Sequence, residues 1–181
     1  MFNEADSFNG DLSDWDVSNV TSMYRMFRLA SSFNGNISTW DVSGNMNQMF
    51  QGAESFNSDI SSWDVSDVTR MNQMFNGATS FNQDLSNWNV SSVTTMTDMF
   101  NGADNFNSDI SNWNVSGVTN MHSMFNEAAS FNGDLSGWDV SNVTTMYRTF
   151  RLASSFNGNI STWEVSGNLN QMFQDAESFN S

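Results

Sequence analysis

Apolar residues recur along the chain as a short alternating pattern followed by a helical one. In the segment 56–80, FNSDISSWDVSDVTRMNQMFNGATS, Trp63 and Val65 point one way and Asp64 the other, as alternation in a strand requires. The next apolar residues stand at i, i+3, i+4 and i+7, the spacing of one helix face: Met71, Met74, Phe75 and Ala78. Each unit is therefore predicted to contain one short strand and one short helix.

The residues that flank the helical pattern support the same prediction. Thr69 precedes it and is a plausible N-cap, while Gly77 suits a helix end. Ile60, Trp63 and Val65 also follow the L-x-x-L-x-L spacing of leucine-rich repeats.

The same unit repeats through the whole chain. Tryptophans stand at positions 15, 40, 63, 88, 113, 138 and 163, in steps of 25 residues with one step of 23. A fixed period of this size indicates an array in which each unit buries its apolar face against its neighbours. We therefore predict an α/β solenoid of the leucine-rich-repeat type, with stacked columns of Trp, Phe, Met and Val and strands that pair in parallel.

A longer period lies on top of the short one. Residues 1–58 match residues 124–181 with seven differences, an offset of 123 residues or five units. Two units are two residues shorter and read V-S-G-N from Val42 and from Val165. We interpret residues 1–181 as a single continuous array of about seven units, a window on a longer array whose caps and anchors lie outside it.

Composition excludes several kinds of function. Five arginines and no lysine face 20 acidic residues in 181, a net charge of −15. Nucleic acids and anionic membrane surfaces are disfavoured partners, because both bind through cationic side chains. The absence of Cys removes disulfides, zinc–thiolate sites and thiol chemistry. No run of apolar residues is long enough for a transmembrane helix.

The strings FNGDLSDWDVSNVTSMYRMF and FNQDLSNWNVSSVTTMTDMF resemble the BspA-like surface-protein repeat, a family with units of about twenty-five residues. The resemblance covers the whole chain. It implies a leucine-rich-repeat-like solenoid displayed outside the cell, used in adhesion or surface structure, and it supplies no catalytic residue.

Acidic side chains form columns that favour a divalent cation as counter-ion. Stacked carboxylates repel one another, and Ca²⁺ accepts irregular sets of oxygen ligands. The candidate cation-binding residues belong to an exposed strand column and to a column before each Leu or Ile: Asp16, Asp41, Asp64, Asp139 and Glu164, and Asp11, Asp59, Asp84, Asp109 and Asp134. The alternatives are a solvated acidic face for the first column and acceptors of turn amides for the second. In each unit, an Asn two residues before the second column could form a ladder that satisfies turn backbone groups.

Four of the five arginines occur in two clusters, 123 residues apart. The candidate docking residues are Tyr24, Arg25, Arg28, Tyr147, Arg148 and Arg151. Arginine forms geometry-specific pairs with carboxylates, so these clusters could contact an acidic column of a neighbouring array. The alternative is intramolecular pairing with nearby Asp or Glu.

Six Asn-x-Ser/Thr sequons could carry glycans in a secreted protein: Asn19, Asn36, Asn89, Asn114, Asn142 and Asn159. His122 is the only histidine, and no nucleophile–base pair stands out, so we expect no enzymatic activity.

The leading hypothesis is an extracellular structural protein that forms or decorates a surface filament, sheath or appendage. Stacked repeats and lateral contacts from Arg to acidic columns of neighbouring copies would build it. The alternatives are a surface adhesin that binds a host protein or glycan through its exposed strand face, and an acidic calcium-binding module.

Overall fold

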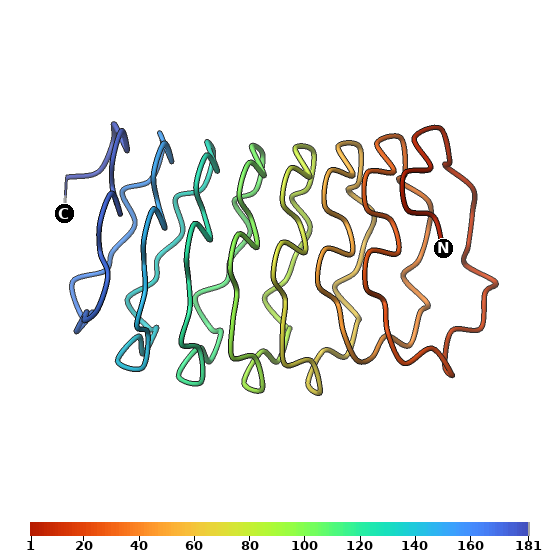
Figure 1. Cartoon of the computed structure of the whole chain (residues 1–181), viewed down its shortest axis with the longest axis horizontal. Coiled ribbons are helices and arrows are strands. Elements are labelled where there is room, and N and C mark those ends of the chain that lie inside the picture. Colours follow the sequence, from red (N-terminus) through yellow and green to blue (C-terminus); the bar gives the residue numbers. More distant parts are fainter. Residues whose placement is uncertain (181) are drawn as a thin grey trace.

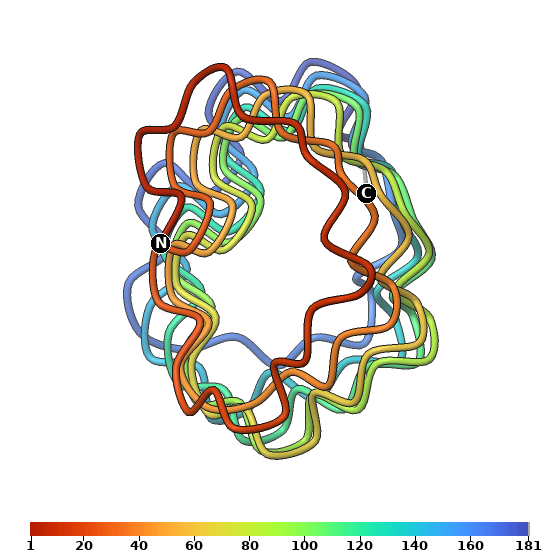
Figure 2. The same cartoon turned by 90° about the vertical axis from the view of Figure 1, so that its right-hand side faces the viewer.

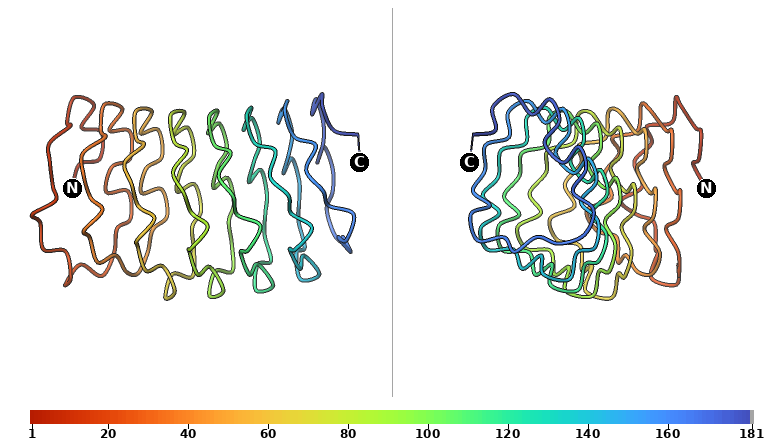
Figure 3. Two further views of the ribbon diagram at one scale, coloured as in Figure 1. Left: turned by 180° about the vertical axis from the view of Figure 1, so that it is seen from behind. Right: turned by 60° about the vertical axis from the view of Figure 1, so that its left-hand side comes forward.

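Successive coils of the chain lie side by side along one axis in the computed structural model, which describes residues 1–180 (Figure 1). Each coil takes one repeat unit, and the view from behind shows the same regular succession (Figure 3). Viewed along the stack, the coil outlines nearly superpose and each is rotated slightly from the last (Figure 2). From the phenylalanine that opens each unit, the coils span residues 8–32, 33–55, 56–80, 81–105, 106–130, 131–155 and 156–178.

The prediction of an α/β solenoid with one helix and one strand per unit is wrong. Residues 1–180 contain no helix and no extended strand. The strand-like pairing in these residues consists of isolated parallel bridges between neighbouring coils: Ser22 to Asn45, Arg70 to Thr95, Thr95 to Asn120, Asn120 to Thr145 and Thr145 to Asn168. These bridges fall after the position expected for the strand, at the start of the position expected for the helix. Within residues 1–180 there is accordingly no helix of the length and apolarity that crossing a membrane requires.

Consecutive tight turns occupy the segment that was predicted to be a helix. The N–H groups of Met74 and Ala78 donate to the carbonyls of Met71 and Phe75 at 3.3 and 3.1 Å, three residues back. The third residue of each turn has positive φ, 56° at Gln73 and 69° at Gly77, which a type II turn requires and a right-handed helix excludes. Thus Thr69 caps no helix and Gly77 ends none.

Alternate N–H groups of the turns bond to the next coil. Three of these bonds measure 2.8, 2.9 and 2.7 Å: Gln73 to Thr97, Phe75 to Met99 and Gly77 to Asn101. A backbone whose polar groups are satisfied by its neighbours does not need a helix to be buried. The apolar side chains still point inward as the spacing predicted, because Met71, Met74, Phe75 and Ala78 are all fully buried.

Aromatic rings form continuous columns through the core. The ring centroids of Phe75 and Phe100 are 5.6 Å apart and those of Phe100 and Phe125 are 5.7 Å apart. A parallel column brings Trp63 within 6.4 Å of Trp88. The indole Nε1 of Trp88 donates to the carbonyl of Ile60 at 3.1 Å. The predicted stacking of bulky side chains over one another is therefore confirmed, although the backbone that carries them differs.

The predicted asparagine ladder runs along the whole stack. In each step an Asn backbone N–H donates to the Oδ1 of the matching Asn one coil earlier, at 2.7–3.0 Å. The members are Asn9, Asn34, Asn57, Asn82, Asn107, Asn132, Asn157 and Asn180. Each side chain thus supplies an acceptor to a turn amide of the next coil.

Candidate functional site

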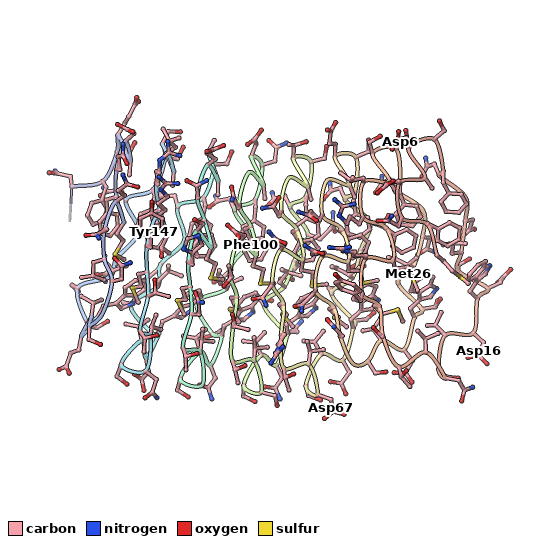
Figure 4. The ribbon with its side chains drawn as sticks, in the orientation of Figure 1. Asp6, Asp16, Met26, Asp67, Phe100 and Tyr147 are labelled. Carbon is pink, nitrogen blue, oxygen red and sulfur yellow. The ribbon has the colours of Figure 1, made fainter. Side chains whose placement is uncertain are left out.

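The acidic columns lie on the outer surface and cap turns. Figure 4 shows Asp16 and Asp67 projecting at one edge of the stack and Asp6 at the opposite edge. The Oδ1 of Asp59 accepts the backbone N–H of Ser61 at 2.9 Å, and Asp64 accepts that of Ser66 at the same distance. The same contact, to the residue two positions on, recurs at Asp11, Asp16, Asp84, Asp109, Asp134 and Asp139, and at Asn36, Asn89, Asn114 and Asn159. Each such residue therefore stabilises a turn.

These contacts shift the carboxylates toward the charged form. The backbone N–H of Ser86, and then its hydroxyl, hold the pKa of Asp84 below its usual 3.8. Slight burial and the neighbouring carboxylates Asp109 and Asp59 act in the opposite direction and are the smaller effects. Repulsion along the column is thus present but weaker than the hydrogen bonds to the turn.

The candidate cation-binding residues do not gather around a point. All ten are exposed: Asp11, Asp16, Asp41, Asp59, Asp64, Asp84, Asp109, Asp134, Asp139 and Glu164. Among the residues that the structure describes, no group of three or more His, Asp or Glu side chains is placed to hold a metal ion. Binding of Ca²⁺ along either acidic column therefore stays a prediction.

Two of the four clustered arginines are engaged in intramolecular ion pairs. Arg28 contacts Glu4 at 3.1 Å, and Arg151 contacts Glu127 at 3.2 Å. Arg28 also donates from Nε to the Oε1 of Gln51 at 3.0 Å. For these two residues the structure has the intramolecular pairing that the sequence left as the alternative to docking.

Arg25 and Arg148 make no ion pair within residues 1–180. The guanidinium of each lies over the ring of the preceding tyrosine, 4.8 Å from the centroid, a cation–π contact. Their Nε atoms donate to Gln48 and Gln171, the latter at 2.6 Å. Tyr147 also stacks on His122, with centroids 5.1 Å apart, so the single histidine is a packing partner.

A shallow groove of about 250 Å³ crosses three coils beside Arg25. Its walls are formed by Tyr24 and Arg25 from one coil and by the Asn–Gln pairs of the next two: Asn47, Gln48, Asn72 and Gln73. The four amide residues are half-buried, and none of the six lining residues is acidic. The chain carries a net charge of −15, whereas this groove is lined by one arginine and no acidic side chain.

Donor-only groups fix the orientation of every amide in the groove. The Oδ1 of Asn47 accepts the backbone N–H of Asn72 at 2.9 Å, and the Oδ1 of Asn72 accepts that of Thr97 at 3.1 Å. The guanidinium Nε of Arg25 is also donor-only, so Gln48 turns its Oε1 toward it. The Nε2 of Gln48 then donates to the Oε1 of Gln73.

The six sequon asparagines are all exposed: Asn19, Asn36, Asn89, Asn114, Asn142 and Asn159. Asn142 differs from most of the others because its Nδ2, the atom to which a glycan would attach, donates to the carbonyl of Ser116 at 2.9 Å. A glycan there would have to displace that bond.

The family described as "Mycoplasma protein of unknown function, DUF285" matches the chain three times in tandem. The matched residues are 1–85, 44–117 and 83–181. The chain belongs to this family. Tandem matches within one chain agree with the repeated coils, so this DUF285 member is a repeat protein. The narrower resemblance to the BspA-like repeat stays a prediction. No curated protein matches the chain.

The amide residues of the groove were not among the residues predicted to be functional. Arg25, Gln48, Gln73, Arg148 and Gln171 occupy the same position in five of the seven units, and Asp98 and Ser123 occupy it in the other two. The recurrence of Gln at the Arg position was the available signal. It was missed because a predicted helix places neighbouring side chains of one unit together, whereas here the contacts join different coils.

Proposed function

We propose that this DUF285 member is a stiff structural element of a surface protein, an extended array that spaces or builds a sheath or appendage outside the cell. The supporting observation is that the contacts between coils repeat from one end of the stack to the other. Backbone bonds, the asparagine ladder and the column of phenylalanine rings all continue through every junction.

The architecture suits a load-bearing role. In a linear array, stability is approximately a sum over neighbouring units and their interfaces. Each coil here is held to the next through its backbone, its core and its rim together, so bending at one junction would disturb three sets of contacts. The surface grooves are shallow, and we assign no catalytic role to them.

Lengthening the array tests the structural role. Residue 181 stands at the phase of residue 58, so a second copy of residues 59–181 appended after position 181 continues the repeat by five coils. We expect the longest dimension in small-angle X-ray scattering to increase by about 24 Å, at roughly 4.8 Å per coil. A matched control appends the same residues in scrambled order. Equal radii of gyration and equal melting for the two would contradict the proposal.

The setting outside the cell is tested separately. Antibodies against the chain should label intact cells as strongly as permeabilised ones. Labelling that requires permeabilisation would contradict a surface role and leave the stack itself unaffected.

The groove beside Arg25 favours adhesin as a second candidate function. It is a polar, non-acidic recess on an otherwise acidic surface, and it lies on the face of the consecutive turns. The adhesin hypothesis placed the ligand on an exposed strand face, so the proposed contact surface moves to a different side of the coils.

Lateral docking between copies stays a prediction that now rests on Arg25 and Arg148, since Arg28 and Arg151 have intramolecular partners. A net charge of −15 on each copy opposes such contacts. Sedimentation of wild type beside a variant carrying both Arg25→Glu and Arg148→Glu is the test. Docking predicts assembly that the double variant abolishes, and a monomeric wild type would contradict it.

A further inference from the structure

The groove beside Arg25 presents hydrogen-bond donors and few free acceptors. The side-chain oxygens of Asn47, Gln48, Asn72 and Gln73 are all taken up by internal bonds. Groups that make no bond within residues 1–180 are the Nδ2 of Asn47 and Asn72, the Nε2 of Gln73 and the two Nη atoms of Arg25. A ligand that matches the groove must therefore be rich in acceptors.

The positive charge of Arg25 further favours a ligand that carries a carboxylate. Arg25 offers two Nη groups in one plane of its cationic guanidinium, a geometry that pairs with a carboxylate through two parallel bonds. No acidic side chain lines the groove to compete for them. The groove is also smaller than most sites for drug-sized ligands, which are roughly 300–1,000 Å³, so it suits one small ring or side group.

The tyrosine at the rim supplies an apolar surface beside the donors. One face of the Tyr24 ring is covered by the Arg25 guanidinium, which orients both groups. An aromatic ring next to several amide donors and an arginine can pack on the apolar face of a sugar while the donors bind its oxygens. We propose that this groove binds an acidic saccharide, with the sugar carboxylate on Arg25 and ring oxygens on the amides of Asn47, Asn72 and Gln73.

Part of the same arrangement recurs five coils further on. Tyr147 and Arg148 hold the same cation–π contact, and Arg148 donates to Gln171 as Arg25 does to Gln48. Asn170 stands in the position of Asn47. An array with this 123-residue period would therefore display acidic-sugar sites at regular intervals. The inference rests on the adhesin role for its biological setting and is independent of the structural role.

The backbone at position 25 is compatible with glutamine, so Arg25→Gln can test the proposal. Arg25 has a φ of 55°, and glutamine already occupies the same position of three other coils, with φ of 59° at Gln48, 56° at Gln73 and 57° at Gln171. Arg25→Gln should therefore fold normally while removing the guanidinium. Arg70→Gln is the matched control, because it removes the same charge from the only arginine outside the two clusters.

Binding is measured by NMR titration with glucuronic acid and with glucose, which lacks the carboxylate. We expect glucuronic acid to shift the side-chain amide signals of Asn47, Asn72 and Gln73, with a Kd at least about tenfold lower than that of glucose. Arg25→Gln should raise the Kd for glucuronic acid about tenfold, and Arg70→Gln should leave it unchanged.

Gln73→Glu gives a second test in the same groove. Asp98 occupies the equivalent position of the next coil, so an acidic residue is compatible with the backbone there. The added carboxylate should repel the ligand and raise the Kd at least tenfold.

Three results would overturn the proposal. Equal weakening by Arg25→Gln and Arg70→Gln would show attraction to overall charge only. Equal binding of inorganic sulfate and glucuronic acid would show an anion site without sugar recognition. If Arg25→Gln abolishes self-association of the protein while glucuronic acid shifts no amide signal, the groove serves a second copy of the chain. The array-length experiment is unaffected by any of these outcomes.

Discussion

The 25-residue coils and the two 23-residue coils keep the same column of phenylalanine rings although their outer loops differ. Phe27 and Phe50 flank the junction with the first short coil at 5.6 Å, and Phe75 and Phe100 flank a regular junction at the same distance. The two missing residues come from the outer loop, where regular coils carry a buried valine such as Val68. A stacked array thus absorbs a deletion at its rim when its aromatic column stays in register.

The short coil closes through a glycine that contacts the preceding backbone. Gly44 has a φ of 74°, and a Cβ placed there would lie 2.0 Å from the carbonyl oxygen of Thr21. Gly167 repeats this geometry in the second short coil, with a φ of 80° and a distance of 2.1 Å to Thr144. The parallel bridges then resume at Asn45 and Asn168. The loss of two loop residues therefore requires glycine at the point of closure.

Removing one ring of the aromatic column should reduce the free energy of unfolding more than any other change, and by the same amount in short and regular coils. Phe50 and Phe100 are both fully buried, so Phe50→Ala and Phe100→Ala should each cost about 3–5 kcal/mol in the free energy of unfolding. Urea unfolding followed by tryptophan fluorescence measures both. A much smaller loss for Phe50→Ala would show that the core of the short coil is loosely packed. It would contradict the conclusion that both coil types keep the same aromatic column.

The glycine substitutions should separate the coil types. Gly44→Ala meets both a left-handed backbone and a carbonyl oxygen, so we expect a loss of about 3 kcal/mol or more. Gly77→Ala in a regular coil is the control. Its φ is 69°, but the nearest heavy atoms to a Cβ lie 3.7 Å away, which leaves only about 1–2 kcal/mol of backbone strain. Equal melting temperatures for the two variants would contradict the closure described above.

Asparagine-ladder substitutions should again be similar in both coil types but smaller. Asn82→Ala in a regular coil and Asn34→Ala in a short coil each leave one backbone N–H without its acceptor, at a cost of about 1–3 kcal/mol. Asn82→Asp retains an acceptor oxygen and serves as the control. If Asn82→Ala melted like Asn82→Asp, the ladder would contribute nothing beyond what water supplies.

Lowering the pH should change the melting temperature least. The change should come from the aspartates that accept hydrogen bonds from turn N–H groups. The backbone N–H of Ser61 lowers the folded-state pKa of Asp59 below 3.8, and its hydroxyl adds to the shift. The resulting stabilisation is present above the unfolded-state pKa and is lost as the pH falls through the lowered value. The melting temperature should therefore decline slightly below about pH 4, and less so in a variant with Asp59, Asp84, Asp109 and Asp134 replaced by Asn. An identical decline in both proteins would place the acid sensitivity elsewhere.

Several features of the site could be read from sequence and others could not. The acidic columns, the arginine clusters and the asparagine ladder each follow from one residue recurring at a fixed period. The partners of Arg28 and Arg25 could not be read in this way, since Glu4 and Gln48 lie 24 and 23 residues away. Which of these residues meet depends on how far each coil is displaced along the stack.

The sequence by itself determined the period and the identity of the buried columns, because bulky apolar residues at a fixed interval can be covered only by their own repeats. Only the tertiary structure decided between a helix and consecutive turns. Met71, Met74, Phe75 and Ala78 face inward in either case, so their spacing does not distinguish the two. The choice follows from where the backbone N–H groups bond. A helix this short is marginal alone, whereas a neighbouring coil offers carbonyls to every second residue, at Gln73, Phe75 and Gly77.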